Sequence, residues 1–331
     1  MKPQTPILGR RIPGRRAAGC RLLACIALLA ATAIAGQTAA TNNPDMLRFG
    51  FSKSMFEDLN QNDARAAMKV YSHTLGDDNQ IPIDSNPMIM DGTNAIVEAL
   101  RRHDVDIISL TSEEFITSEN QGLDGPLIVS RVNRSITEEY VLLVRVDSRV
   151  QKLEDLRGTR LILGHDIRTS LAHLWLEVLC RENGLGPANQ VFASQSTALK
   201  ATQVILPVFF GKMDACVATR NAWMVMGELN PQVTNQLRAL AVSHPVIPGL
   251  CCFRSGLSPA LKERLITVAK NSTDKPAFKQ LMALFKTDNL EPRPVSELAG
   301  TRELVARFRN LSPAAAIPPV PTPPSKEAPA Q

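Results

Sequence analysis

The chain has 331 residues, enough for about two domains with a sizeable core, and its 44% hydrophobic and 21% charged residues are ordinary for a globular protein. The formal net charge of +5 comes from the N-terminus, because residues 1–35 hold six of the 37 Lys and Arg residues and none of the 32 Asp and Glu residues. The remaining chain is close to neutral, so we expect no nucleic-acid partner and no anionic membrane surface.

The N-terminal stretch has the layout of a secretory signal peptide. Basic residues precede an apolar run, Leu22–Ala35, and this run ends in the small-x-small sequence Ala33-Ile34-Ala35, which is typical of a cleavage site. The run is too short and too poorly flanked to be a good membrane-spanning helix. We therefore expect residues 1–40 to be a signal peptide and linker, and the mature protein to reside in the periplasm.

Strands and helices are predicted to alternate in the first third of the mature chain. Met46–Phe51 is predicted to be a strand that ends in the polar loop Ser52-Lys53-Ser54, and a helix opens at Asn62. Val105–Leu110 is predicted to be a buried strand, followed by Thr111-Ser112 at the start of another helix. This order is typical of a mostly parallel sheet with helices on both faces.

A second α/β unit follows and is predicted to be inserted into the first. Its strands and helices run from about Asp147 to Ser243, and further helices return toward the first unit. We expect residues 41–143 and 247–312 to form one lobe, residues 144–246 to form the inserted second lobe, and residues 313–331, which are rich in Pro and Ala, to be a disordered tail.

The stretch Gly158–Arg181 carries the first functional hypothesis. It is predicted to be a strand (Thr159–Leu163), a polar loop and a buried helix that opens at Thr169-Ser170. Free backbone N–H groups and the helix dipole favour an anion at such an opening, and Arg168 would add a charge. The alternative is that Thr169 or Ser170 only caps the helix.

Similar polar residues follow several other predicted strands, where open α/β sheets bind their ligands. Hydroxyl donors with one or two cations suit a small oxyanion, although Ser and Thr at these positions are also common N-caps. Tyr140 begins a predicted crossing strand and would pack either on a ligand or in the core. The candidate ligand-binding residues are Ser52, Ser54, Thr111, Ser112, Tyr140, His165, Arg168, Thr169, Ser170, Thr219 and Arg220.

The sequence offers little support for catalysis. It contains no nucleophile elbow, no zinc-protease motif, no Walker loop and no Rossmann glycine fingerprint, and no nucleophile can be assigned beside His165-Asp166. We therefore expect no enzyme activity, no cofactor and no metal. The four cysteines beyond the leader match no zinc pattern, and they form either one disulfide (Cys216 with Cys251 or Cys252) or, like Cys180, remain buried free thiols.

From about Leu47 to Leu265 the chain resembles the phosphate/phosphite/phosphonate-binding family of periplasmic solute-binding proteins of ABC transporters. The segments that carry the resemblance are LRFGFS, VEALRRHDVDIISLTSEEF, EEYVLLVRVDSRVQKLEDLRGTRLIL, ENGLGPANQVF, LPVFFGKMDACVATRNAW and LAVSHPVIPGL. The resemblance implies a two-lobed periplasmic-binding-protein fold of α/β class, in which two strands, Tyr140–Arg145 and about Ser243–Phe253, form a hinge between the lobes.

The resemblance also implies a ligand clamped between the lobes and presented to a membrane permease. Family members that bind phosphonates carry a Ser-Thr-Ser run followed by Gly, and the matching positions here are Arg168, Thr169 and Ser170, followed by Leu171. A guanidinium at the first position would favour a more fully charged anion or would fill the pocket itself.

These observations together predict a monomeric periplasmic protein that captures a phosphonate-, phosphite- or phosphate-like oxyanion for an ABC transporter. Thr169 and Ser170 would hold the anion from the second lobe, and Ser52, Ser54, Thr111 and Ser112 would complete the site from the first. The alternative is an orphan sensor or accessory protein of the same fold that signals to a membrane receptor, which the Pro-rich tail favours as a tether.

Overall fold

The computed structural model describes residues 46–56 and 60–311. All of these residues belong to one compact unit. The predicted signal peptide and the predicted Pro-rich tail lie outside the described residues. Within the described ranges, none of the helices combines the length and the apolar character that crossing a membrane requires.

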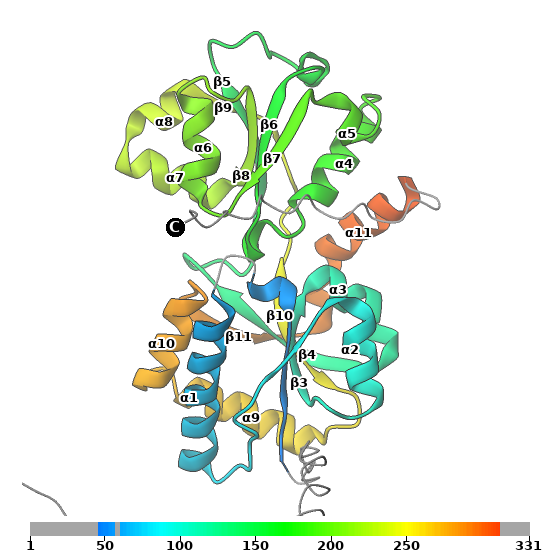
Figure 1. Ribbon diagram of the computed structural model, residues 1–331, viewed down its shortest axis with the longest axis vertical. Helices are drawn as coiled ribbons and strands as arrows, with labels where there is room; N and C mark the ends of the chain where they lie inside the picture. The colour runs from blue at the N-terminus through cyan, green and yellow to red at the C-terminus, as the bar shows by residue number, and fades with distance from the viewer. Residues whose placement is uncertain (1–45, 57–59, 312–331) are drawn as a thin grey trace, which may run out of the picture. The chain divides into compact units, whose positions relative to one another are not determined.

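The first sheet has six strands in the order β11-β4-β10-β3-β1-β2 (Figure 1). Strand β1 pairs in parallel with β2 and β3, whereas β10 and β11 pair antiparallel with their neighbours. The strands are β1 (Phe49–Ser52), β2 (Met88–Met90), β3 (Ile107–Thr111), β4 (Leu123–Arg131), β10 (Gly249–Arg254) and β11 (Asn289–Arg293).

Helices cover both faces of this sheet because its side chains alternate between two apolar sets. Ile108, Leu110 and Leu127 pack toward α2 (Gly92–Arg101) and α3 (Ser112–Ser118). Ile107 and Phe253 face the opposite side, where the covering helices are α1 (Gln61–Asn79), α9 (Pro259–Asn271) and α10 (Pro276–Leu284), and a short 3-10 turn, η1 (Lys53–Phe56), follows β1.

The second sheet has five strands in the order β7-β6-β8-β5-β9. One face, with Leu142 and Val144, packs on α4 and α5, and the other, with Val141 and Leu143, packs on α6, α7 and α8 (Figure 1). The strands are β5 (Tyr140–Arg145), β6 (Arg160–Gly164), β7 (Ser194–Ala198), β8 (Ala215–Thr219) and β9 (Leu237–Val242), and the helices are α4 (Ala172–Glu182), α5 (Ala188–Val191), α6 (Ala201–Phe209), α7 (Arg220–Leu229) and α8 (Pro231–Gln236).

Both sheets are mixed rather than mostly parallel, which corrects the prediction. The parallel pairs are β1 with β2 and β3 in the first sheet, and β6 with β7 and β8 in the second. Strands β4, β5, β9 and β10, by which the chain leaves or enters a sheet, pair antiparallel with their neighbours, and β4 and β5 are not partners of each other.

Two segments, residues 132–139 and 243–248, connect the sheets, and they pair where Glu138 meets Val246. The Glu138 N–H donates to the Val246 carbonyl at 2.8 Å, and the Val246 N–H donates back at 2.9 Å. A two-stranded connection is therefore present, but the predicted boundary at residues 143/144 falls inside β5, which pairs with β8 and β9 along its length.

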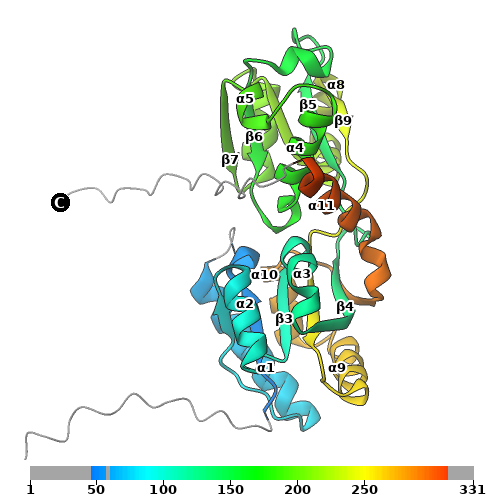
Figure 2. The same ribbon diagram turned by 90° about the vertical axis from the view of Figure 1, so that its right-hand side faces the viewer.

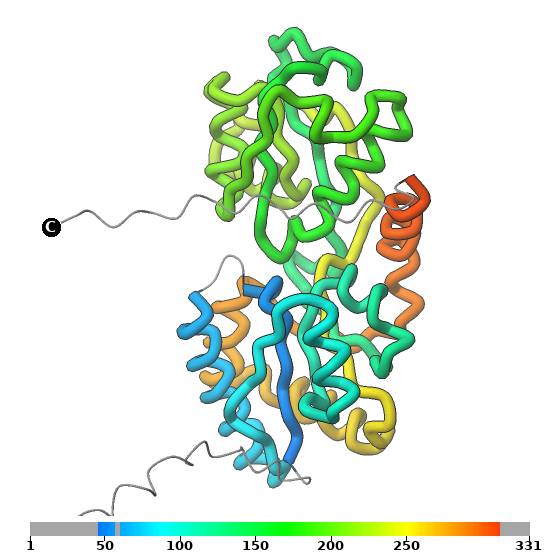
Figure 3. Tube along the Cα trace, turned by 45° about the vertical axis from the view of Figure 1, so that its right-hand side comes forward, coloured from blue at the N-terminus to red at the C-terminus, as the bar shows by residue number. Residues whose placement is uncertain are grey.

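The last helix, α11 (Ala299–Leu311), contacts both sheets' helices rather than returning to the first lobe alone as predicted (Figures 2 and 3). Leu304 and Val305 are buried in the core of the second sheet beside α4. On its solvent side, Arg307 donates to the Glu182 carboxylate at 2.9 Å. The C-terminal helix thus packs against the inserted unit.

Candidate functional site

The helix that was predicted to begin at Thr169-Ser170 begins at Ala172 instead (α4), so the predicted start is wrong. A 3-10 turn, η4 (Ile167–Thr169), precedes the helix. Asp166 and Thr169 form a capping box across this turn. The Thr169 N–H donates to Asp166 Oδ1 at 3.0 Å, and the Thr169 hydroxyl donates to the same oxygen at 2.8 Å. A carboxylate of the chain itself therefore occupies the donors that were predicted to hold an external anion.

Ser170 and Tyr140 anchor the turn from behind. The Ser170 hydroxyl donates to the Pro248 carbonyl at 3.2 Å, and the Tyr140 hydroxyl donates to the Arg168 carbonyl at 3.0 Å. Tyr140 is fully buried, and its ring packs 6.2 Å from that of Trp175. Tyr140 thus packs in the core and positions the Arg168 turn, which is one of the two roles that the sequence left open.

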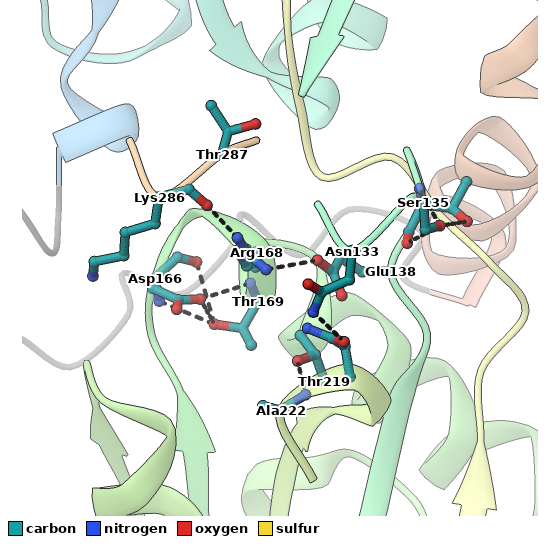
Figure 4. Close-up of polar contacts among 12 residues, drawn as sticks. Asn133, Ser135, Glu138, Asp166, Arg168, Thr169, Thr219, Ala222, Lys286 and Thr287 are labelled. Carbon is teal, nitrogen blue, oxygen red and sulfur yellow. Dashed lines mark hydrogen bonds and ion pairs between the residues drawn. The ribbon is translucent and has the colours of Figure 1, made fainter. Parts of the chain in front are cut away.

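The Arg168 side chain lies between Glu138, in one of the segments that connect the sheets, and Lys286 (Figure 4). Its guanidinium lies 3.5 Å from the Glu138 carboxylate and donates to the Lys286 carbonyl in the connection between α10 and β11. Glu138 is only 8% exposed, and its burial raises its pKa to about 7 despite the attraction of Arg168. At neutral pH the carboxylate that neutralises Arg168 is therefore itself partly protonated.

In the first sheet's unit, the hydroxyls that were predicted to bind ligand converge on Glu114. Ser52 donates to Glu114 Oε1 at 2.6 Å, Ser54 donates to the same oxygen at 3.1 Å, and the Thr111 hydroxyl donates to Oε2 at 3.0 Å. Thr111 and Glu114 form a capping box at the start of α3. The Ser/Thr-x-x-Glu spacing could have revealed this role from the sequence.

Ser112 lies beside this cluster. Its backbone N–H donates to the Pro248 carbonyl at 3.0 Å. Its side-chain oxygen is buried and has no hydrogen-bond partner among the residues that the structure describes. Ser112 does not line any of the pockets described below.

The remaining predicted residues follow β6 and β8. Thr219 is the N-cap of α7 and accepts the Ala222 N–H at 3.1 Å, while Arg220 pairs with Glu139 at 3.1 Å on the surface. The His165 N–H donates to the Ala198 carbonyl at 2.9 Å, which fixes the end of β6 beside β7. Glu139 is partly exposed, whereas its neighbour Glu138 is buried.

A pocket of about 330 Å³, here called the polar pocket, opens at the carboxyl ends of β6, β7 and β8. Arg168, Thr169 and Thr219 line it, and α6 and α7 begin at its edge. Lys200, Thr202, Asn221 and Lys286 also line it, and none of these four was predicted. Lys200, Thr202 and Asn221 follow strand ends and were open to prediction, whereas Lys286 comes from the first sheet's unit and carries no local signal.

Of the two alternatives for the cysteines, the structure has the free thiols. Cys180, Cys216, Cys251 and Cys252 are all free thiols, and Cys216 lies in β8 of the second sheet whereas Cys251 and Cys252 lie in β10 of the first. Burial raises the pKa of the Cys180 thiol to about 12 and that of the others in the same direction, so none is an activated nucleophile. Among residues 46–56 and 60–311, no three side chains of the kinds that bind metals cluster together.

Known proteins resemble the chain in sequence pattern and in fold. The family model of ABC transporter, phosphonate, periplasmic substrate-binding proteins matches residues 60–294. No match was found among curated proteins.

Solved structures share the fold at low sequence identity. A Xanthomonas citri protein bound to chloride ion has 20% identity and a TM-score of 0.57, with 81% of this chain and 98% of that chain covered. PhnD1 from Prochlorococcus marinus in complex with methylphosphonate has 17% identity and a TM-score of 0.54 over 82% of this chain and 100% of that chain. The binding protein component of an ABC phosphonate transporter from Pseudomonas aeruginosa has 14% identity and a TM-score of 0.52 over 80% and 87%.

The two mixed sheets flanked by helices are the type II periplasmic binding fold, and the family match covers most of the described residues. The chain therefore belongs to the family of periplasmic substrate-binding proteins of phosphonate ABC transporters.

Proposed function

We propose that the protein captures a small phosphorus oxyanion, such as a phosphonate, phosphite or phosphate, in the polar pocket and delivers it to the permease of an ABC transporter. The observation that carries the proposal is the lining of this pocket, where Arg168, Lys200 and Lys286 stand beside threonine hydroxyls. Cations and hydroxyl donors at strand ends and at the starts of two helices provide the charge and hydrogen bonds that an oxyanion requires.

Most of the predicted site residues fall into three roles in this proposal. Arg168 and Thr219 contact the anion, together with Lys200 and Lys286, whereas Thr169 pairs with Asp166 and shapes the turn beside them. Ser170, Tyr140 and His165 position the loop that carries them. Ser52, Ser54 and Thr111 hold Glu114, and this cluster shapes the first sheet's unit rather than touching the ligand.

Binding is coupled to the arrangement of the two units through Lys286. The ligand would contact Arg168 and Thr219 from the second sheet's unit and Lys286 from the first, so it binds most tightly where these groups stand together. A ligand shifts a conformational equilibrium by its difference in affinity for the two states. The bound state is what the permease would recognise, and no chemical step is required of the protein.

The membrane partner is proposed from the family. An ABC permease is favoured, with the binding protein acting as a monomer in the periplasm. A membrane sensor is the alternative, and the segment that suggested it lies outside the described residues. Permease and ATPase genes beside the coding sequence would support transport, whereas a neighbouring kinase or cyclase gene would support sensing.

Isothermal titration calorimetry tests the site. We expect heat from at least one of phosphate, phosphite, methylphosphonate and 2-aminoethylphosphonate, and we expect Lys200→Ala to weaken that binding about tenfold, as for loss of one charged hydrogen bond. The matched control is Lys212→Ala, which removes an exposed lysine of the same unit away from the pocket. The absence of heat with all four ligands, or equal weakening by both variants, contradicts the proposal.

A further inference from the structure

One face of the first sheet is not covered by a continuous core. On the α1, α9 and α10 side, the buried side chains fall into two separate clusters. Leu75, Ile107 and Phe253 belong to the first cluster, and Met55, Met68 and Met282 belong to the second. The opposite face of the same sheet carries a single cluster.

The space that both clusters line is a cavity of about 140 Å³, here called the apolar cavity. Phe49, Phe51, Tyr71 and Leu281 complete its wall, and its few polar groups are hydroxyls and the Cys251 thiol. Protein interiors are normally packed to crystal density, so an opening of this size in a core is unusual. A dry cavity of ~150 Å³ lined by such side chains is large enough to bind benzene.

The apolar cavity leads toward Arg168. It shares Met55, Ser109 and Ile128 with a smaller cavity of about 60 Å³. The smaller cavity is in turn lined by Glu138, Arg168 and Lys286, and two of these, Arg168 and Lys286, also line the polar pocket. The wall therefore changes from aromatic and aliphatic to charged along one direction.

The η4 turn lies where the two environments meet. Ile167 lines both the smaller cavity and the apolar cavity, while the next residue, Arg168, lines the smaller cavity and the polar pocket. Ile167 can reach this position because residue 249 is a glycine, since a Cβ there would lie 3.0 Å from Ile167 Cδ1. One turn thus presents an apolar and a cationic side chain to adjacent parts of the same space.

We propose that the ligand is amphipathic, with an anionic head at Arg168 and an unbranched aliphatic tail of about six carbons in the apolar cavity. This inference rests on the proposed anion site and names the ligand class that the site takes. The head would replace Glu138 as the partner of Arg168. The tail would pass beneath Ile167 and fill the space between the two core clusters.

Calorimetry with methyl-, butyl-, hexyl- and octylphosphonate tests the tail. Each methylene that enters an apolar site is expected to raise the affinity up to about fourfold, with the gain ending near hexyl, because the cavity is then full. If methylphosphonate, butylphosphonate and hexylphosphonate bind with equal affinity, the tail site is contradicted, but the proposed anion site is not. Binding of hexylphosphonate without binding of methylphosphonate supports the tail site and counts against a small-ligand protein, whereas no binding by any member overturns both.

A variant of the cavity wall, a control variant and the neutral ligand 1-hexanol make the test specific. Ala269→Leu on α9 adds a side chain to the cavity wall and is expected to remove the gain from hexylphosphonate while methylphosphonate binding persists. Ala283→Leu, on the exposed side of α10, is the matched control and is expected to bind the whole series like the unaltered protein. Unchanged hexylphosphonate affinity in Ala269→Leu, or binding of 1-hexanol as tight as that of hexylphosphonate, contradicts the proposal.

Discussion

Glu138 and Arg168 show how burial and charge compete at a single pair of residues. The carboxylate is 8% exposed and lies 3.5 Å from the guanidinium, which favours its ionised form. Desolvation opposes ionisation and is the larger effect, so the pKa of Glu138 rises from 4.5 to about 7. An anionic ligand and the ionised Glu138 therefore compete for the same cation.

Anion affinity is accordingly expected to fall as the pH rises through about 7, where Glu138 ionises and pairs with Arg168. Glu138→Gln should lose this dependence, because the amide cannot ionise. Calorimetry with methylphosphonate between about pH 6 and about pH 8 compares the two proteins, and the difference between them isolates Glu138 from the ligand's own second ionisation. Glu139→Gln is the control, and a profile shared by Glu138→Gln and the unaltered protein would contradict the expectation.

The same shift predicts the pH dependence of stability. Since the folded-state pKa of Glu138 lies above the unfolded value of 4.5, its contribution is fully favourable below pH 4.5 and is lost as the pH rises toward about 7. The loss is at most ~3 kcal/mol at ~1.4 kcal/mol per pH unit. Urea unfolding should show Glu138→Gln gaining stability relative to the unaltered protein between about pH 5 and about pH 8. If the stability difference between Glu138→Gln and the unaltered protein were the same at both pH values, the raised pKa of Glu138 would be contradicted.

At the scale of an element, Glu114 ties the end of β1 and the η1 turn to the start of α3. Its carboxylate accepts the hydroxyls of Ser52, Ser54 and Thr111 and also the Thr111 N–H at 2.9 Å. Removing the carboxylate would leave these buried donors without an acceptor.

Glu114→Ala is expected to lower the free energy of unfolding by about 2–4 kcal/mol, since each unsatisfied buried donor costs about 1–3 kcal/mol. Glu113→Ala, one residue earlier on the same helix, removes a carboxylate whose pKa is raised by burial and by the neighbouring Glu114, and it should change stability by less than about 1 kcal/mol. Chemical denaturation of the two variants measures both values. A loss in Glu113→Ala as large as that in Glu114→Ala would refute the role of the cluster.

Element positions were predictable where strands are apolar and helices amphipathic. The strand predicted at Val105–Leu110 lies close to β3 (Ile107–Thr111). Strand β7 (Ser194–Ala198) could not be predicted in this way, because this edge strand is polar and mostly exposed and so lacks an apolar run. Thr169 was misread because its partner is the side chain of Asp166, which periodicity does not reveal.

At the scale of the whole molecule, α11 begins against the segment that connects the sheets. Gly300 lies so close to this segment that a Cβ would stand 2.7 Å from the Pro245 carbonyl oxygen. Further along the helix, Leu304 is buried with the core of the second sheet. The helix start therefore has little room to move relative to residues 243–248.

Gly300→Ala is expected to lower the free energy of unfolding by about 1–3 kcal/mol, because a backbone carbonyl cannot move aside as a flexible side chain can. Ala306→Ser on the outer side of the same helix is the control and should be nearly neutral. Thermal unfolding of both variants measures the effect. Stability equal to that of the unaltered protein in Gly300→Ala would show that the helix start adjusts freely.

The two-unit organisation could be predicted from element order and from the resemblance, but the composition of the site could not. Lys286 reaches the polar pocket from a connection more than a hundred residues away from Arg168 in sequence, and no local pattern signals it. The antiparallel strands were missed for the same reason, because pairing between distant segments depends on tertiary packing.

The placement of the aromatic residues has an optical consequence. The chain contains two tryptophans, Trp175 in α4 and Trp223 in α7, and both belong to the second sheet's unit. Trp175 packs against Tyr140, whose hydroxyl holds the Arg168 carbonyl. Intrinsic tryptophan fluorescence therefore reports on the Arg168 turn without any added label. The first sheet's unit contributes no emission when tryptophan is excited selectively, because both tryptophans belong to the second sheet's unit.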